Sequence, residues 1–338
     1  MSSAIIFPAQ PENILKGLGK LWTSYGHEEK QQGKPTVLRA CAMTLIVATD
    51  EPDGGFIASQ TISELMHEHP ARGIVLAVSP DAEKSLEARV LAQCWKPFGK
   101  AQQICCEQIE IMARPESWPN VGPTLIGLTA ADLPVIFWCR HGHALSKAAT
   151  ADQKAGLEAL VNLATKVIVD TSGMSPGGAI ELLARWQAQN RVVADLEWTR
   201  LTAWREPLAH MFDNVSGANS FANVHTIEIE HAGNTPPVAA LYLAGWLSAP
   251  YRANVSFRPV ERSAPGIHSI NLHLHSGMIT FERNDDGSFT LRCPNGRERK
   301  YSLSEPSITA LMTEELTLTG ADPAFNAAFA RAEELVTL

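Results

Sequence analysis

The strongest constraint on the fold lies in the first half of the chain, where short apolar segments of strand length alternate with helical patterns. The apolar segments lie at 37–49, 73–79, 89–98, 102–113, 134–140 and 166–172, and the helical patterns at 56–69, 124–132 and 151–165. This alternation is typical of an α/β layer whose strands are covered by helices. We therefore predict an α/β N-terminal domain with a mixed, largely parallel sheet.

The N-terminal segment predicts one short helix followed by a linker. Ile14, Leu18 and Leu21 recur at helical spacing with lysines between them, which is typical of an amphipathic helix. The polar stretch at 26–34 has no such apolar periodicity. We therefore expect it to connect the helix to the first strand without regular structure.

The second half of the chain has a different pattern. A helix is predicted at 177–189, and an apolar helix after Pro236-Pro237, because prolines fit the first turn of a helix. Four or five strands then follow without intervening helices, separated by turns that contain glycine. Two further helices are predicted near 306–316 and 323–335. This order predicts an α+β C-terminal domain with an antiparallel meander.

The length of 338 residues fits two domains. Glycine, serine and proline cluster at 171–176, between the two patterns. We therefore expect a boundary there, with an N-terminal domain at 1–172, which includes the amphipathic helix, and a C-terminal domain at 173–338.

Charge and hydropathy narrow the classes of partner. Twenty-eight basic residues against thirty-six acidic ones give a net charge of −8, so the surface has no long-range attraction for phosphate backbones or anionic lipids. The longest apolar stretch, 238–247, is about half the length that crosses a bilayer. The first residues lack the basic start of an export signal. We therefore expect a cytoplasmic protein that binds neither nucleic acid nor membrane.

The first strand-to-helix turn argues against a nucleotide cofactor. A dinucleotide site needs a GxGxxG turn there so that backbone amides can approach the pyrophosphate. The turn at 49–56 instead has one glycine pair and three acids, which would repel a phosphate. A later turn, 170–178, joins a strand to a helix N-terminus where an anion could bind. An ordinary helix cap is the favoured interpretation of that turn, and we predict no cofactor.

Two histidines on one predicted strand, His273 and His275, share a face, as two metal ligands would. No third ligand is fixed by the sequence, so a solvated polar face is the favoured interpretation and no metal is predicted.

With ordinary alternation the same face gathers Ser256, Arg258, Asn271, His273, His275, Glu282 and Arg292, with Arg297 and Arg299 nearby. Such a face is locally basic, although a simple solvated face explains it equally well.

The segment Asp195–Glu206 (DLEWTRLTAWRE) holds two tryptophans and two arginines within eight residues. Trp and Arg dominate binding hot spots, so this composition suits an interface anchor. The alternative is a strand-to-helix corner, with Val192–Trp198 as the strand and the tryptophans filling the core. Composition alone favours the corner.

The six cysteines show no CxxC pairing of the kind that binds metals, and most lie among apolar neighbours. Buried reduced thiols are therefore the favoured interpretation. The adjacent Cys105 and Cys106 cannot point the same way on a strand, since successive side chains alternate. They remain a candidate thiol switch that the spacing does not demand.

Seven segments occur in the chain in a fixed order: KPTVLRACAMTLIVAT, EHPARGIVLAV, CCEQIEI, LPVIFWCR, KVIVDTSG, DLEWTRLTAWRE with the following FD, and YLAGWL. Taken together and in this order, they resemble the glucose-6-phosphate dehydrogenase assembly protein family, OpcA. The N-terminal helix ending in Leu21-Trp22 fits as well, so the resemblance covers nearly the whole chain. It implies an N-terminal α/β domain and a C-terminal domain.

The resemblance implies a non-catalytic partner that binds glucose-6-phosphate dehydrogenase and promotes its active oligomeric form, in support of the oxidative pentose phosphate pathway. Trp198, Arg200, Trp204 and Arg205 would then be motif residues that contact the enzyme or shape the surface that does. One departure from the family pattern is Ala203, which occupies the place of a proline before the second tryptophan, while Pro207 lies within the following segment. We therefore expect the following helix to start one or two residues later. Two alternatives stay open: an enzyme acting on a phosphorylated sugar or nucleotide, and a thiol-based redox sensor.

Overall fold

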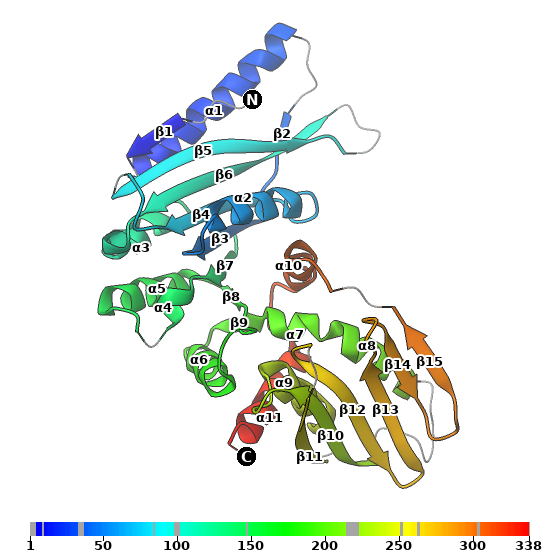
Figure 1. Ribbon diagram of the computed structural model, residues 1–338. Coiled ribbons are helices and arrows are strands. Elements are labelled where there is room, and N and C mark those ends of the chain that lie inside the picture. Colours follow the sequence, from blue (N-terminus) through cyan, green and yellow to red (C-terminus); the bar gives the residue numbers. More distant parts are fainter. Residues whose placement is uncertain are drawn as a thin grey trace. The chain divides into compact units, whose positions relative to one another are not determined.

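The computed structural model of the protein describes residues 5–8, 10–32, 37–83, 85–97, 102–146, 148–213, 223–250, 253–261, 264–302 and 305–337. The chain forms two compact units (Figure 1). The first comprises Met1–Val169 and Asn190–Val193, and the second comprises Asp170–Gln189 and Ala194–Leu338. The chain therefore passes between the units three times, whereas the sequence suggested one boundary.

The described strands of the first unit form a nine-stranded sheet with the order β1-β5-β6-β4-β3-β7-β8-β9, in which β2 pairs with β6. The strands are β1 (Ile5–Pro8), β2 (Val37–Arg39), β3 (Met43–Thr49), β4 (Ala71–Val78), β5 (Leu86–Trp95), β6 (Gln103–Ala113), β7 (Val135–Arg140), β8 (Lys166–Val169) and β9 (Val192–Asp195). Neighbours in the run β6-β4-β3-β7-β8 are parallel, whereas β5 is antiparallel to β6 and to β1. The predicted mixed, largely parallel sheet is confirmed.

The helices of the first unit connect these strands. They are α1 (Pro11–Gln32), α2 (Gly54–Leu65), α3 (Trp118–Ile126), α4 (Gly142–Leu145) and α5 (Ala151–Leu163), with a short 3₁₀ turn, η1 (Pro115–Ser117). The core strands β3 and β4 are buried along their whole length, as expected for parallel strands that are covered on both faces.

Two helix boundaries differ from the sequence expectation. The helix α1 continues to Gln32, so the predicted linker at 26–34 is wrong over most of its length. Glu, Lys and Gln are good helix formers, and a search for apolar periodicity does not register them. The helix α3 begins at Trp118, six residues before the predicted start, because Pro119 occupies its first turn.

The described strands of the second unit form a six-stranded sheet with the order β11-β10-β12-β13-β14-β15. They are β10 (Val224–Ala232), β11 (Asn254–Val260), β12 (Ile267–Leu274), β13 (Gly277–Arg283), β14 (Phe289–Arg292) and β15 (Glu298–Tyr301). The predicted antiparallel meander is confirmed from β12 to β15. The strand β11 departs from it, because it lies parallel to β10 after a helical crossover.

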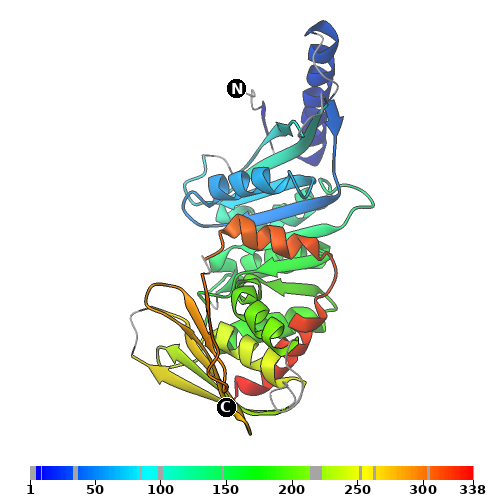
Figure 2. The ribbon, with the colours of Figure 1, turned by 90° about the vertical axis from the view of Figure 1, so that its right-hand side faces the viewer.

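Helices in the described part of the second unit accompany this sheet: α6 (Pro176–Ala188), α7 (Leu196–Arg200), α8 (Thr202–Asp213), α9 (Val238–Ser248), α10 (Ile308–Thr317) and α11 (Pro323–Leu335). The crossover helix α9 is buried on nearly every side. It contacts β10 on one side and lies beside α11 on another (Figure 2). The Tyr242 ring meets Phe325 edge-on at 5.5 Å between ring centroids. A helix that is apolar all round must be covered all round, and α11 provides part of that cover.

The contact between α9 and α11 generates a prediction about Gly245. A Cβ atom at Gly245 would overlap the backbone carbonyl of Ala328, and backbone can retreat only by moving a whole helix. We expect Gly245→Ala to lower the free energy of unfolding by about 3 kcal/mol, measured by urea denaturation.

A second helical glycine provides the matched control. Gly177 lies in the first turn of α6, and a Cβ atom added there would meet open space. Gly177→Ala should therefore leave stability unchanged or raise it slightly, since alanine favours the helix. Equal effects of the two substitutions would contradict the close approach of α9 and α11.

Candidate functional site

The segment Asp195–Glu206 lies in the second unit, at the end of β9 and in the helices α7 and α8. The sequence predicted a strand up to Trp198, but the strand ends at Asp195 and Trp198 lies in α7. The reason is an N-cap: the Asp195 carboxylate accepts a hydrogen bond from the Glu197 backbone N–H at 3.0 Å. A capping carboxylate satisfies a free N–H of the first turn and so begins the helix.

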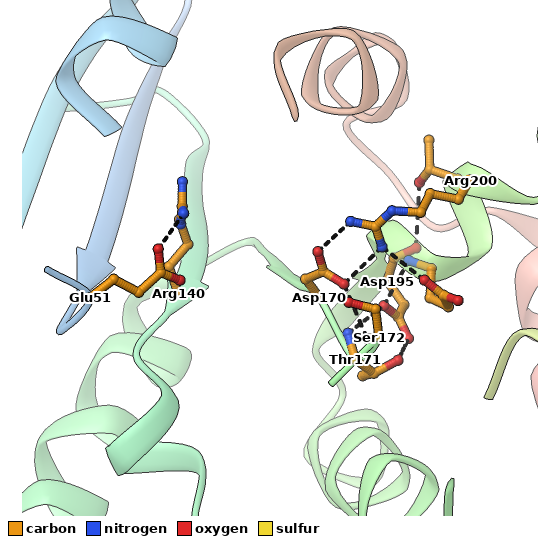
Figure 3. A network of polar contacts seen from close by, with 9 residues as sticks. Glu51, Arg140, Asp170, Thr171, Ser172, Asp195 and Arg200 are labelled. Carbon is orange, nitrogen blue, oxygen red and sulfur yellow. Dashed lines mark hydrogen bonds and ion pairs between the residues drawn. The ribbon is translucent and has the colours of Figure 1, made fainter. Parts of the chain in front are cut away.

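The Asp195 carboxylate is fully buried and accepts four hydrogen bonds from described residues. Figure 3 shows it beside Thr171, which gives two of them. Besides Glu197, the donors are the Thr171 backbone N–H at 3.1 Å, the Thr171 hydroxyl at 2.5 Å and the Tyr242 hydroxyl at 2.7 Å. One carboxylate thus joins the turn after β8, the start of α7 and the middle of α9.

Burial dominates the electrostatics of this carboxylate. It raises the pKa of Asp195 to about 7, because the charged form loses its hydration, and the hydrogen bonds from Thr171 and Glu197 limit the rise. Burial also raises the pKa of the Tyr242 hydroxyl well above its ordinary value. Tyr242 therefore acts as a hydrogen-bond donor and does not ionise near neutral pH.

A second, more exposed network lies beside the first, around Arg200 (Figure 3). The Arg200 guanidinium donates to both Asp170 carboxylate oxygens, at 2.8 and 2.5 Å, and to Glu197 at 2.8 Å. Burial alone would raise the pKa of Asp170, but the Arg200 bonds hold it below its ordinary value. In the same turn Ser175 caps α6 by accepting from the Gly178 backbone N–H. The polar groups of this turn therefore bond within the protein, as an ordinary cap would.

Both tryptophans of the motif are buried. Trp198 is 3% exposed, donates through Nε1 to Asp322 at 2.8 Å, and lies under the Arg205 guanidinium, 3.8 Å from the ring centroid. Trp204 is 8% exposed and meets Phe281 and Phe289 edge-on, at 5.3 and 4.7 Å between ring centroids. Aromatic pairs in this geometry stabilise a core beyond the area they bury.

Hydroxyl groups tie the same segment to α10. Thr199 donates to Glu315 at 2.8 Å, and Thr202 donates to Glu314 at 2.7 Å. Arg205 donates to the Thr202 hydroxyl at 2.8 Å. The structure thus brings Trp198, Arg200, Trp204 and Arg205 together, but as a junction of the second unit rather than as an exposed patch.

Pro207 lies within α8 instead of delaying its start. The helix begins at Thr202, where the backbone N–H groups of Trp204 and Arg205 donate to the Leu201 carbonyl. The packing of Trp204 and Met211 in the core outweighs the cost of a proline inside the helix.

Sequence reasoning missed the partners of this motif: Thr171, Asp170, Tyr242 and Asp322. A signal existed for Asp195 alone, since an aspartate that precedes a helical pattern is a capping signature. The other partners are distant in sequence, and only the tertiary fold brings them to the motif.

In the first unit, the side chain of Asp50 is the centre of a separate hydrogen-bond network, which lies where the parallel strands end. Asp50, directly after β3, accepts from the backbone N–H groups of Gly142 at 3.0 Å and His143 at 2.8 Å. The Nδ1 atoms of His141 and His143 lie 3.0 and 2.6 Å from it. Burial would raise the pKa of Asp50, but these contacts hold it well below its usual range. Arg140 pairs with Glu51 in the same region (Figure 3).

Asp50 lies at the point in the strand order where related sheets bind a ligand. Numbered among themselves along the chain, the five parallel strands lie in the order 3-2-1-4-5, which is β6-β4-β3-β7-β8. Sheets with this strand order bind dinucleotides at the carboxyl ends of the strands, between the first and the fourth. Here that point lies between β3 and β7, where Asp50 occupies the amide donors. A side-chain carboxylate therefore lies at the carboxyl ends of β3 and β7 and accepts from the backbone N–H groups of the turn after β7.

The cysteines differ in part from the expectation of reduced thiols. Cys94 and Cys105, which face each other across β5 and β6, form a disulfide. Cys106 is a buried free thiol whose Sγ lies 3.3 Å from the Ala40 carbonyl oxygen, and burial raises its pKa to about 11. A thiol with that pKa is a poor nucleophile at neutral pH. A switch role for Cys105 and Cys106 stays a prediction.

The polar face of the second sheet carries paired charges. Arg258 on β11 contacts Glu228 and Glu230 on β10, and Arg292 on β14 contacts Glu282 on β13 at 2.6 Å. These acids offset the basic character expected of the face.

Two histidines of the second unit, His225 and His275, lie near each other. His275 lies 5.2 Å from His225, between ring centroids, at one end of the sheet. Among the described residues, no three His, Cys, Asp or Glu side chains are arranged to hold a metal ion.

In the described part of the chain, no helix is both long enough and apolar enough to cross a membrane.

Two family models match the chain. The model for the glucose-6-phosphate dehydrogenase subunit N-terminal domain matches residues 62–185, and the model for its C-terminal domain matches residues 191–329. Both belong to the OpcA family, and together they cover more than half of the chain.

Three curated relatives carry the description putative OxPP cycle protein OpcA. The one from Synechocystis is 27% identical over 209 residues, which is 60% of this chain and 41% of the relative. The one from Nostoc punctiforme is 27% identical over 191 residues, 55% of this chain and 39% of the relative. The one from Synechococcus elongatus is 26% identical over 288 residues, 76% of this chain and 61% of the relative. The matched region thus spans less than two thirds of each relative.

Among solved structures, an oxidoreductase from Sinorhizobium meliloti aligns with 9% identity and a TM-score of 0.43, over 88% of this chain and 96% of that one. A likeness of this strength bears on neither the fold nor the activity of the chain.

The Asp195 network predicts an unusual pH dependence. Because the folded-state pKa of about 7 lies above the ordinary 3.8, the stability that the protonated carboxyl contributes is complete below about pH 4 and is lost as the pH rises through 7. An asparagine in its place would keep the pattern, since its amide accepts from the two backbone N–H groups and donates to the two hydroxyls. We expect the stability of Asp195→Asn relative to the parent protein to rise between pH 5 and pH 8 in urea titrations.

Asp195→Ala provides the contrast for this test. It leaves the buried N–H groups of Thr171 and Glu197 without acceptors, so it should cost about 3 kcal/mol or more at every pH. A parent protein that becomes more stable than Asp195→Asn as the pH rises would show that Asp195 is ionised in the fold.

The Cys94–Cys105 disulfide predicts a response to reductant. It closes a loop with a sequence separation of 11, and cross-linking such a loop stabilises a fold by about 3 kcal/mol. We expect dithiothreitol to lower the unfolding midpoint of the parent protein and to leave that of a Cys94→Ser, Cys105→Ser double variant unchanged.

Thiol counting on the denatured, unreduced protein should find Cys41, Cys106, Cys139 and Cys293. Six reactive thiols there would contradict the disulfide.

Proposed function

We propose, since this chain belongs to the OpcA family of glucose-6-phosphate dehydrogenase subunits, that it binds glucose-6-phosphate dehydrogenase and promotes its active oligomeric form. The observation that carries the proposal is the match of both family domains, at 62–185 and 191–329. The protein would act as a non-catalytic partner in the cytoplasm and would support the oxidative pentose phosphate pathway.

The polar networks agree with a role in binding rather than in catalysis. Catalytic groups need polar atoms that are available to a substrate. Here the Asp195 carboxylate is enclosed by Thr171, Tyr242 and the start of α7. The Asp50 carboxylate likewise accepts from the backbone N–H groups of the turn after β7. These groups support the fold, and the proposal therefore places the contact with the dehydrogenase on the surface.

Promotion of an active oligomer requires differential affinity. A partner that binds the active form of the dehydrogenase more tightly than the inactive form shifts the population toward the active form. The size of the shift is limited by the difference between the two binding free energies. A rigid binding surface raises the affinity of the complex, because little entropy is lost when it forms.

The motif residues contribute to this rigidity. Trp198 and Trp204 are buried, and Arg200 is paired with Asp170 and Glu197. We assign them a positioning role: they fix α7 against its neighbours in the second unit, and α7 in turn fixes the loops around it. Of the two roles that the family resemblance allows, the burial of both tryptophans supports shaping the surface over direct contact.

The decisive experiment mixes the purified protein with the glucose-6-phosphate dehydrogenase of the same organism at micromolar concentration. Size-exclusion chromatography should show co-elution, and the dehydrogenase should gain activity or a larger oligomeric state. The protein alone, with glucose 6-phosphate and NADP, should show no turnover. Absence of both co-elution and any kinetic response would refute the proposal, and turnover by the protein alone would favour the enzyme alternative.

A pair of variants separates the positioning role from direct contact. Trp198→Ala loses the contacts with Asp322, Arg205 and Phe325, so it should lower the melting temperature and the activation together, with a cost of about 3 kcal/mol or more in stability. Trp198→Phe keeps an aromatic ring and should retain most of both. Loss of activation in Trp198→Ala with an unchanged melting temperature would instead place Trp198 in the interface.

A further inference from the structure

Among the described residues, Phe56 is the most exposed large apolar side chain, at 72%. It lies in the first turns of α2, in the first unit. Met112, near the end of β6, is 43% exposed. A phenylalanine exposed to this degree costs the free protein favourable burial, and exposed apolar patches with polar rims mark interaction sites.

Two contacts place these two residues at the same end of the sheet. A Cβ atom at Gly55 would lie 2.9 Å from the Ala77 Cβ, so the start of α2 packs directly on the end of β4. Ala77 is paired with Met112 across β4 and β6. Together these contacts define an apolar surface, which we call the Phe56–Met112 patch.

The helix that carries Phe56 is held firmly against the sheet. Ser59, one turn after Phe56, bonds with Glu110 and with the Gln108 amide on β6. Arg89 on β5 pairs with the same Glu110. These bonds fix α2 at the carboxyl end of β6, so Phe56 is presented on a rigid base and a partner would meet it already in place.

The patch has an acidic rim. Asp53 directly precedes α2 without a capping hydrogen bond from its side chain, Asp81 follows the end of β4, and both side chains are exposed. Glu87 lies beside Met112 in the register of β5 and β6. Neither Asp53 nor Asp81 forms an ion pair with a described residue. Acidic residues therefore accompany both members of the patch, since Asp53 precedes Phe56 by three residues and Glu87 is paired with Met112.

This combination selects the kind of partner. An anionic lipid surface would be repelled by the rim. A second copy of this chain, docked symmetrically through the same patch, would bring two acidic rims together, which like-charge repulsion disfavours. A protein with an apolar pocket bordered by lysine or arginine satisfies both the centre and the rim.

We propose that the Phe56–Met112 patch is the surface on which the dehydrogenase docks, with Phe56 inserted into an apolar pocket of that enzyme and basic residues of the enzyme facing Asp53 and Asp81. This inference rests on the proposed function. It extends that function by naming the face and the chemistry of the contact.

The test measures the affinity of the full-length protein for the dehydrogenase by titration calorimetry. Phe56→Ser should weaken binding about 30-fold or more, as expected for a central anchor. Met278→Ser is the matched control, because Met278 is 47% exposed on β13 of the second unit and lies outside the patch. It should leave the affinity within about twofold of the parent protein. Both variants should keep the parent melting temperature, since both positions are exposed.

Substitutions of the acidic residues at the rim provide a second, independent test. Asp81→Lys should slow association with the dehydrogenase and reduce its dependence on salt concentration. Asp53→Asn should have a smaller effect in the same direction. Asparagine is chosen there because Asp53 has a φ of 56°, a conformation that asparagine tolerates and lysine does not.

The outcomes separate the two proposals. If the parent protein binds the dehydrogenase and Phe56→Ser binds equally well, the docking surface lies elsewhere while the proposed function stands. If the parent protein does not bind at all, the proposed function fails and this inference fails with it. Equal losses in Phe56→Ser and Met278→Ser would point to a general effect of surface polarity and would overturn the assignment of the patch.

Discussion

The second unit depends on one buried carboxylate. Asp195 stands at the junction of a strand and a helix, and its four described donors come from the turn after β8, the start of α7 and the middle of α9. A buried carboxylate with fewer partners would cost more than it contributes. With all four hydrogen bonds formed, the carboxylate instead favours one packing arrangement, because only that arrangement of the three elements brings every donor to it. The Trp–Arg motif is built directly onto that arrangement.

The first unit also contains a carboxylate that is bonded within the protein, at the carboxyl ends of its parallel strands. Its parallel strands have the order of a nucleotide-binding sheet, and their carboxyl ends would normally face a ligand. Asp50 fills that position from within the chain and bonds with the turn after β7. Both units therefore satisfy these polar positions internally. The internal bonding of these two carboxylates agrees with the proposed role as a partner of another enzyme.

Sequence patterns predicted the fold better than the site, for physical reasons. Alternating apolar strands and helices reflect local periodicity, so the mixed sheet and the meander from β12 to β15 could be read directly. The parallel pairing of β11 with β10 could not, because it depends on where α9 packs. At the site, composition singled out Trp198 and Trp204 but could not tell core from surface. Their burial follows from Asp322, Phe281 and Phe289, which lie far along the chain.

The enclosure of α9 has a consequence for synthesis on the ribosome. Its apolar residues need the ring of Phe325 and the backbone around Ala328, and both belong to α11, near the end of the 338 residues. The nascent chain must therefore carry an uncovered apolar helix while some eighty residues that follow it are still being added. Over that interval the helix is a natural target for chaperones, and truncation before α11 would leave it permanently uncovered.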